Sequence, residues 1–122
     1  MIYQLFDIDV SDYEIVEVND YLHKYEYNGK YEVLLRLEKE QLDAFIASID
    51  NRYYFYDDEY TRHTFVENVT GREWNSNDMK YESLGSVKRK LPFFISEPKT
   101  VISLIVISEA GDAYNVELYY IE

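Results

Sequence analysis

The chain has 122 residues, is 17% aromatic, and carries a net charge of −12 from 24 acidic and 12 basic residues. Disordered chains of high charge are poor in aromatic residues, so this composition predicts one folded domain spanning residues 1–122. The absence of cysteine excludes disulfides and cysteine-based zinc sites, and the negative charge disfavours direct binding to nucleic acid or to anionic membranes.

The first part of the chain is predicted to form strands. Residues 2–9 alternate apolar and polar side chains, and residues 13–18 are rich in β-branched residues, as strands are. The Asn-Gly dipeptide at 28–29 is typical of a two-residue hairpin turn, whose register would pair Tyr31 with Glu26. No basic region followed by an apolar run opens the sequence, so we expect no secretory signal and a cytoplasmic location.

Residues 38–50 change to the helical period, because apolar side chains recur at Leu42, Phe45 and Ile49. This segment is predicted to be the main helix, with its apolar stripe packed on one face of a sheet. Residues 52–56 are then predicted as a strand, which must place aromatic side chains on both of its faces.

The second half of the chain contains the clearest strand signal. Residues 70–86 are the least regular segment and are predicted to be mainly turns. Residues 100–108 are apolar on both faces, which predicts a central strand covered from both sides. After a short turn, residues 113–121 alternate again, so a C-terminal β-hairpin is expected over 100–121.

The predicted fold is therefore α+β. It has a mostly antiparallel sheet of about six to eight strands, with the helix at 38–50 on one face. If the strand at 113–121 lies at an edge of the sheet, its tyrosines could pair two copies of the chain, so a homodimer is a possible assembly.

The sequence carries no catalytic or cofactor motif: it has no P-loop, no GxGxxG and no GxSxG. Its two histidines, His23 and His63, lack the spacing of a metal site, and close carboxylate pairs are inevitable among 24 acidic residues. We therefore expect a protein that is not an enzyme and that needs no cofactor or metal. A carboxylate- or metal-dependent hydrolase is the least favoured alternative.

Acidic residues and tyrosines are the candidates for binding a partner. Residues 1–60 hold 15 acidic and 5 basic residues, a net charge of −10, whereas residues 61–122 hold 9 and 7, a net charge of −2. Alternate acids on a strand would form a row of negative charge with a spacing of roughly 7 Å, and tyrosine provides rigid contact area at interfaces. The predicted partner-binding residues are Asp7, Asp9, Asp12, Glu14, Glu17, Asp20, Tyr54, Tyr56, Asp57, Asp58, Glu59 and Tyr60.

In composition, this profile resembles the small acidic inhibitors of nucleic-acid machinery, which include phage anti-CRISPR and anti-restriction proteins that mimic the charge of DNA. The resemblance implies a cytoplasmic inhibitor that neutralises a basic protein partner by surface complementarity. An immunity protein that blocks a basic bacterial toxin, such as a nuclease, fits the same composition. An acidic exterior that serves only solubility is the third reading.

Overall fold

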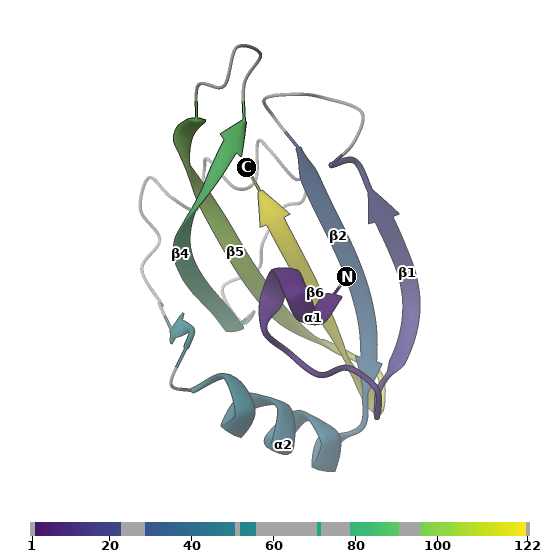
Figure 1. Ribbon diagram of the computed structural model, residues 1–122. Helices are drawn as coiled ribbons and strands as arrows, with labels where there is room; N and C mark the ends of the chain where they lie inside the picture. The colour runs from purple at the N-terminus through teal and green to yellow at the C-terminus, as the bar shows by residue number, and fades with distance from the viewer. Residues whose placement is uncertain are drawn as a thin grey trace.

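The computed structural model describes residues 2–22, 29–50, 52–55, 71, 79–90 and 96–121. These residues form an α+β fold, an antiparallel sheet with two helices (Figure 1), which confirms the predicted fold class. The helices are α1 (Ile2–Phe6) and α2 (Lys39–Ile49). The strands are β1 (Glu14–Asp20), β2 (Lys30–Leu37), β3 (Tyr54–Phe55), β4 (Met79–Lys90), β5 (Ser96–Ala110) and β6 (Ala113–Ile121). They form one six-stranded sheet in the order β1-β2-β6-β5-β4-β3.

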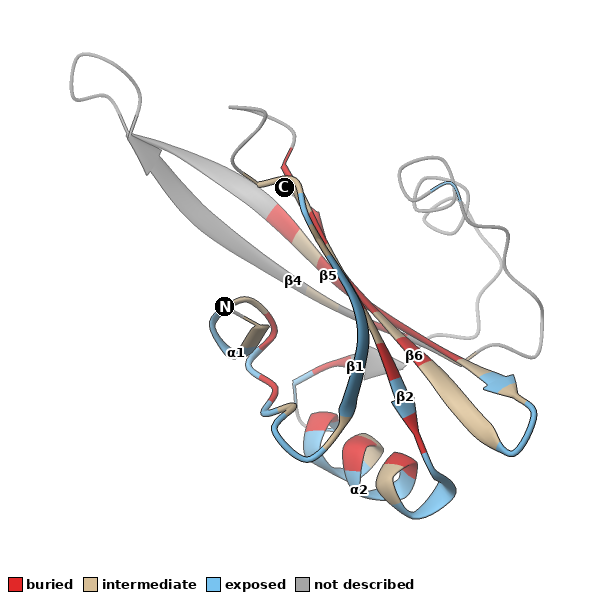
Figure 2. Ribbon diagram, turned by 90° about the vertical axis from the view of Figure 1, so that its right-hand side faces the viewer, coloured by how far each residue is buried: buried red, intermediate tan, exposed pale blue. Residues whose placement is uncertain are grey.

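Helix α2 confirms the helix predicted from the apolar period. It begins with a capping box, in which Gln41 Oε1 accepts a hydrogen bond from the Glu38 N–H at 2.9 Å. The apolar stripe of Leu42, Phe45 and Ile49 is buried against the sheet. Both helices lie on the same side of the sheet (Figure 2), so this side holds the main core.

Helix α1 replaces the first half of the strand predicted at 2–9, so that prediction is wrong. Asp7 follows the helix with a φ of 56°, which turns the chain and places Phe6 and Ile8 on the buried side. The Phe6 ring lies 6.4 Å from Tyr31 and 6.3 Å from Tyr120, centroid to centroid. Packing onto these rings outweighs the strand propensity of the segment, which is a weak and context-dependent preference.

The predicted hairpin register at 28–29 is also wrong. Strand β1 confirms the strand predicted at 13–18, but it places Asp20, rather than Glu26, opposite Tyr31. The connection from β1 to β2 therefore spans residues 21–29, of which 23–28 lie outside the described part of the chain. A period-two pattern is compatible with several registers, and only the pairing of the whole sheet selects one of them.

Strand β5 lies between β6 and β4 and is buried on both faces, as predicted. Leu104 and Val106 belong to a small cluster on the face away from the helices, whereas Ile105 and Ile107 belong to the main core. Strands β5 and β6 form the predicted C-terminal hairpin. Gly111, with a φ of 64°, occupies the first of the two turn positions, where a positive φ favours glycine.

Two further expectations are corrected in the second half of the chain. Strand β4 occupies 79–90 and pairs with β5 along its whole length, so the predicted turn region at 70–86 is wrong from Met79 onwards. Strand β6 lies between β2 and β5, which excludes pairing of two copies through an open edge at 113–121. Tyr119 and Tyr120 are both buried, one on each face of β6.

Candidate functional site

The predicted acids of the N-terminal region fall into two groups. Asp7, Asp9 and Asp12 lie in the connection between α1 and β1, so they form no row along a strand as expected. Asp9 Oδ1 accepts a hydrogen bond from the Ser11 N–H at 3.0 Å, and this bond lowers the pKa of Asp9. These residues shape a connection rather than a rigid charged face.

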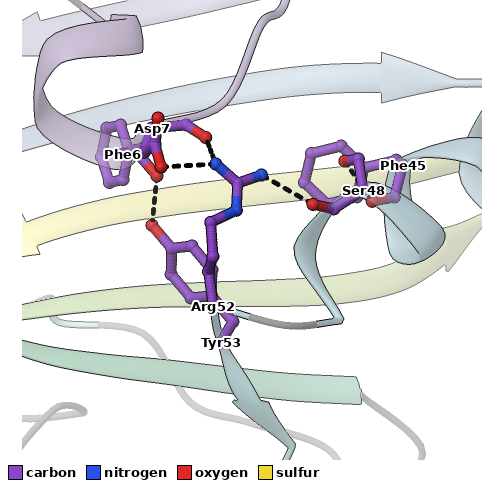
Figure 3. Close-up of polar contacts among 6 residues, drawn as sticks. All are labelled: Phe6, Asp7, Phe45, Ser48, Arg52 and Tyr53. Atoms are coloured by element: carbon purple, nitrogen blue, oxygen red, sulfur yellow. Dashed lines mark hydrogen bonds and ion pairs between the residues drawn. The ribbon is translucent and has the colours of Figure 1, made fainter.

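Asp7 belongs to a polar cluster that joins α1 to the end of α2 (Figure 3). Arg52 Nη1 lies 2.7 Å from Asp7 Oδ2 and also donates to the Asp7 carbonyl. The same guanidinium donates through Nη2 to the Ser48 carbonyl at 2.6 Å, beside the C-terminus of α2, where a cation is favoured. Because the positive charge of Arg52 compensates the Asp7 carboxylate, Asp7 has a structural role in this cluster.

The acids of β1 lie on a strand, but they are divided between its two faces. Glu14 is opposite Arg36 and Glu17 is opposite Leu34, on the face away from the helices. Asp20 is opposite Tyr31, on the helix face, where burial and, to a smaller extent, Asp20 raise the pKa of Tyr31. A register shift between Ile15 and Glu17 leaves Val16 without a partner in β2, which marks a β-bulge.

The face away from the helices carries an open groove of about 200 Å³, which we call the acidic groove. Glu17, Leu34 and Glu117 form one row across β1, β2 and β6. Since neighbouring strands are about 4.8 Å apart, the two carboxylate-bearing residues of this row lie roughly 10 Å apart on either side of the leucine. The groove is lined by Glu17, Asn19, Glu32, Val33, Leu34, Asn115, Glu117 and Tyr119.

Hydrogen bonds and one ion pair orient the three carboxylates of the acidic groove. Asn19 Nδ2 donates to Glu17 Oε1 at 3.2 Å, and the Tyr119 hydroxyl donates to Glu117. Lys30 Nζ lies 3.2 Å from Glu32 Oε1. The described lining residues thus include three carboxylates and no basic side chain.

Such a groove can receive a cationic side chain. Its carboxylates accept charge-assisted hydrogen bonds, and Leu34 between them offers apolar contact to the aliphatic part of a lysine or arginine. Of its three acids, only Glu17 was predicted as a binding residue. Glu32 and Glu117 were missed because they come from different strands, and only the register of β1, β2 and β6 brings them together.

Strand β1 is also an exposed edge of the sheet (Figures 1 and 2). Its apolar side chains are open to solvent, with Ile15, Val16 and Val18 exposed to 45%, 48% and 43%. Their β-branched pattern predicted the strand but gave no sign of this exposure, since the same pattern is typical of buried strands.

The structure does not describe the side chains of the remaining predicted partner-binding residues. Tyr54 lies in β3, where its backbone pairs with Glu82, and its side chain is not described. Tyr56, Asp57, Asp58, Glu59 and Tyr60 lie outside the described residues. The predicted role of residues 56–60 in partner binding therefore stays a prediction. The neighbouring Tyr53 belongs to the main core, with 6% of its surface exposed.

The described residues contain no group of three or more histidine, aspartate or glutamate side chains that could hold a metal ion. His23 and His63 lie outside the described ranges. No helix in the described part of the chain has the length and apolar character needed to cross a membrane.

Comparisons with known proteins provide no relative from which a role could be transferred to this site. The chain matches no family model, and no curated protein or solved structure matches it.

Proposed function

We propose that this protein is a binding protein that neutralises a basic protein partner through the acidic groove and the adjoining strand β1. The observation that carries the proposal is the set of three carboxylates, from Glu17, Glu32 and Glu117, around one open groove. Lys30 pairs with one of them, Glu32, and the described lining of the groove includes no basic side chain. A surface that served only solubility would mix both signs of charge more evenly.

The groove is suited to binding because its carboxylates are held in place before a partner arrives. They project from three hydrogen-bonded strands, and the side chains of Asn19 and Tyr119 donate hydrogen bonds to two of them. Less side-chain entropy is therefore lost when a cation binds. The net charge of −12 adds long-range attraction, which speeds association with a basic partner.

The partner we propose is an enzyme that handles nucleic acid, as in anti-CRISPR or anti-restriction inhibition. The carboxylates would occupy the positions of backbone phosphates in its basic groove and so exclude the substrate. An immunity protein against a basic toxin nuclease would use the same surface, and the identity of the captured partner separates these two functions. A partner from a defence system supports the first, and a toxin supports the second.

The experiment compares two double variants that change the net charge equally. Glu17→Lys with Glu117→Lys reverses charge in the acidic groove, whereas Glu109→Lys with Asp112→Lys reverses exposed charges at the β5–β6 turn. A partner is captured from lysate with the wild-type chain, identified and purified. Its dissociation constant and its nuclease or nucleic-acid-binding activity are then measured with each variant.

We expect the groove variant to bind at least about tenfold more weakly and to lose inhibition, while the turn variant stays close to wild type. Glu17→Gln with Glu117→Gln keeps the shape of the groove and should give an intermediate loss. Affinity of the wild type should also fall as NaCl rises from about 50 to 500 mM, because salt screens exposed charges. Equal binding by the lysine variant of the groove and the turn variant would contradict the proposal, and so would an affinity that does not change with salt.

A further inference from the structure

We infer that β1 is the acceptor edge for an extended basic segment of the partner protein, which adds a strand to the sheet. The inference rests on the proposed function and deepens it by naming the mode of binding and the form of the bound segment. Strand β1 is first in the sheet order, and within the described part of the chain it pairs only with β2. One side of its backbone is therefore available to a further strand.

The register shows which backbone groups point outwards. The Tyr21 N–H donates to the Lys30 carbonyl at 2.9 Å, just beyond the paired residues Asp20 and Tyr31. Hydrogen-bonded and non-hydrogen-bonded pairs alternate along an antiparallel ladder. Asn19 therefore turns its backbone groups towards β2, whereas Val18 and Asp20 turn theirs away from the sheet. These two residues provide the donors and acceptors for an added strand.

The side chains of β1 offer apolar contact on both sides of the bulge. Ile15, Val16 and Val18 are each more than 40% exposed, and they are the described large aliphatic side chains with such exposure. On an edge strand, exposed β-branched residues favour association with another strand, since the added side chains cover them. Alternate apolar residues of the incoming segment would contact Val18 on the helix side of the sheet.

Charge selects a basic segment as the occupant, rather than a second copy of this chain. A second β1 would bring the same three carboxylates, Glu14, Glu17 and Asp20, alongside those of the first, and like charges on paired strands are destabilising. The bulge at Val16 further hinders pairing of two identical edges. Arg36 lies opposite Glu14 across the ladder, whereas Glu17 and Asp20 lie opposite uncharged residues of β2, Leu34 and Tyr31.

The acidic groove adjoins this edge and adds negative charge that complements a basic segment. Glu17 belongs both to β1 and to the groove lining. A lysine or arginine on the face of the added strand that points away from the helices would lie beside Glu17 and could reach towards the groove. The bound segment should therefore alternate basic and apolar residues, with its basic side chains on the face away from the helices.

The experiment uses a defined probe, an acetylated and amidated eight-residue peptide that alternates lysine and valine. Its binding to the ¹⁵N-labelled full chain is followed by NMR, together with solvent exchange of the backbone amides. We expect shifts concentrated on β1 and at least about tenfold slower exchange of the Val18 and Asp20 amides. A matched peptide, N-methylated at alternate residues on its pairing edge, keeps the charge and should bind at least about tenfold more weakly. A glutamate–valine peptide should not bind.

A variant of this chain tests the outward-pointing Val18 N–H directly. Val18→Pro removes an N–H that points outwards and leaves the β1–β2 hydrogen bonds intact, whereas Val18→Ala trims the side chain and keeps the N–H. Once the NMR spectra show both variants to be folded, we expect Val18→Pro to bind the lysine–valine peptide at least about tenfold more weakly than Val18→Ala. If Val18→Pro does not fold, the N-methylated peptide decides the question.

Failure of this inference and failure of the proposed function give different results. Equal binding of the methylated and unmethylated peptides, or no binding of either, overturns strand addition. The charge-reversal test of the acidic groove with the captured partner is unaffected by that result. Conversely, amide protection at Val18 together with unchanged partner binding by the groove variant would support strand addition and contradict the acidic groove as the basis of function.

Discussion

At the scale of single residues, Tyr53 shows how a buried hydroxyl joins the first helix to the rest of the molecule. Its side chain lies in the main core, and its hydroxyl donates to the Phe6 carbonyl at 2.9 Å (Figure 3). Burial raises the pKa of Tyr53 to about 12, although a hydrogen bond with Ser103 and the nearby charge of Arg52 act in the opposite direction. The contact holds α1 against the sheet.

Removing this hydroxyl should destabilise the fold. Tyr53→Phe leaves the Phe6 carbonyl without its donor, so we expect the free energy of unfolding to fall by about 1–2 kcal/mol. Tyr3→Phe changes an exposed side chain of α1, and its free energy of unfolding should stay within about 0.5 kcal/mol of wild type. Urea denaturation at neutral pH measures both. An equal effect of the two substitutions would show that the hydroxyl bond contributes nothing to stability.

The same residue predicts a dependence on alkaline pH. The pKa of Tyr53 is raised from 10.0 to about 12 in the folded chain. Its contribution to stability is therefore complete below pH 10 and is lost as the pH rises towards 12, because the unfolded chain ionises first. The wild type should lose on the order of 2 kcal/mol of stability across this range that Tyr53→Phe does not lose, so its advantage over Tyr53→Phe should vanish or reverse. Urea denaturation at several alkaline pH values measures it, and a constant difference would contradict the prediction.

At the scale of elements, the start of α2 depends on Gln41. Its side-chain oxygen accepts from the Glu38 N–H, and its Nε2 donates to the Asp12 carbonyl at 3.1 Å. The first bond satisfies a helix terminus, and the second ties the helix to the turn that precedes β1. One side chain therefore positions both the helix and the beginning of the proposed acceptor edge.

Two substitutions separate these contributions. Gln41→Ala removes both bonds and should lower the free energy of unfolding by about 1–2 kcal/mol. Gln41→Glu keeps the acceptor of the capping box but cannot donate to Asp12, so about half of that loss is expected. Thermal and urea denaturation measure the two variants. If Gln41→Glu loses as much as Gln41→Ala, the capping box adds nothing here.

At the scale of the whole molecule, the dominant quantity is the net charge of −12, most of it in the first 60 residues. Repulsion among these carboxylates opposes compact folding and is screened by salt. We expect the melting temperature to rise by several degrees between about 10 and 500 mM NaCl. The variant with Glu17→Lys and Glu117→Lys should show a smaller rise. Calorimetry measures both, and a melting temperature that falls with salt would contradict this account.

The sequence alone determined the elements whose signals are local. The apolar period predicted α2, the run of apolar residues predicted the central strand β5, and the short turn after it predicted the C-terminal hairpin. These features follow from the periods of the helix and the strand, which nearby residues establish by themselves. The antiparallel α+β class followed from their sum. Of the candidate site, the sequence predicted the acidic character of the N-terminal half and three acids of β1.

The tertiary structure decided which strands are neighbours and which face each side chain occupies. Only the register brings Glu17, Glu32 and Glu117 to one groove, places β6 inside the sheet, and leaves β1 at its edge. A shift of one residue in pairing would move a side chain to the opposite face, and an alternating pattern does not say which shift is taken. Strand order depends on contacts between residues far apart in the chain, and this is why the location of the site could not be derived from composition and spacing.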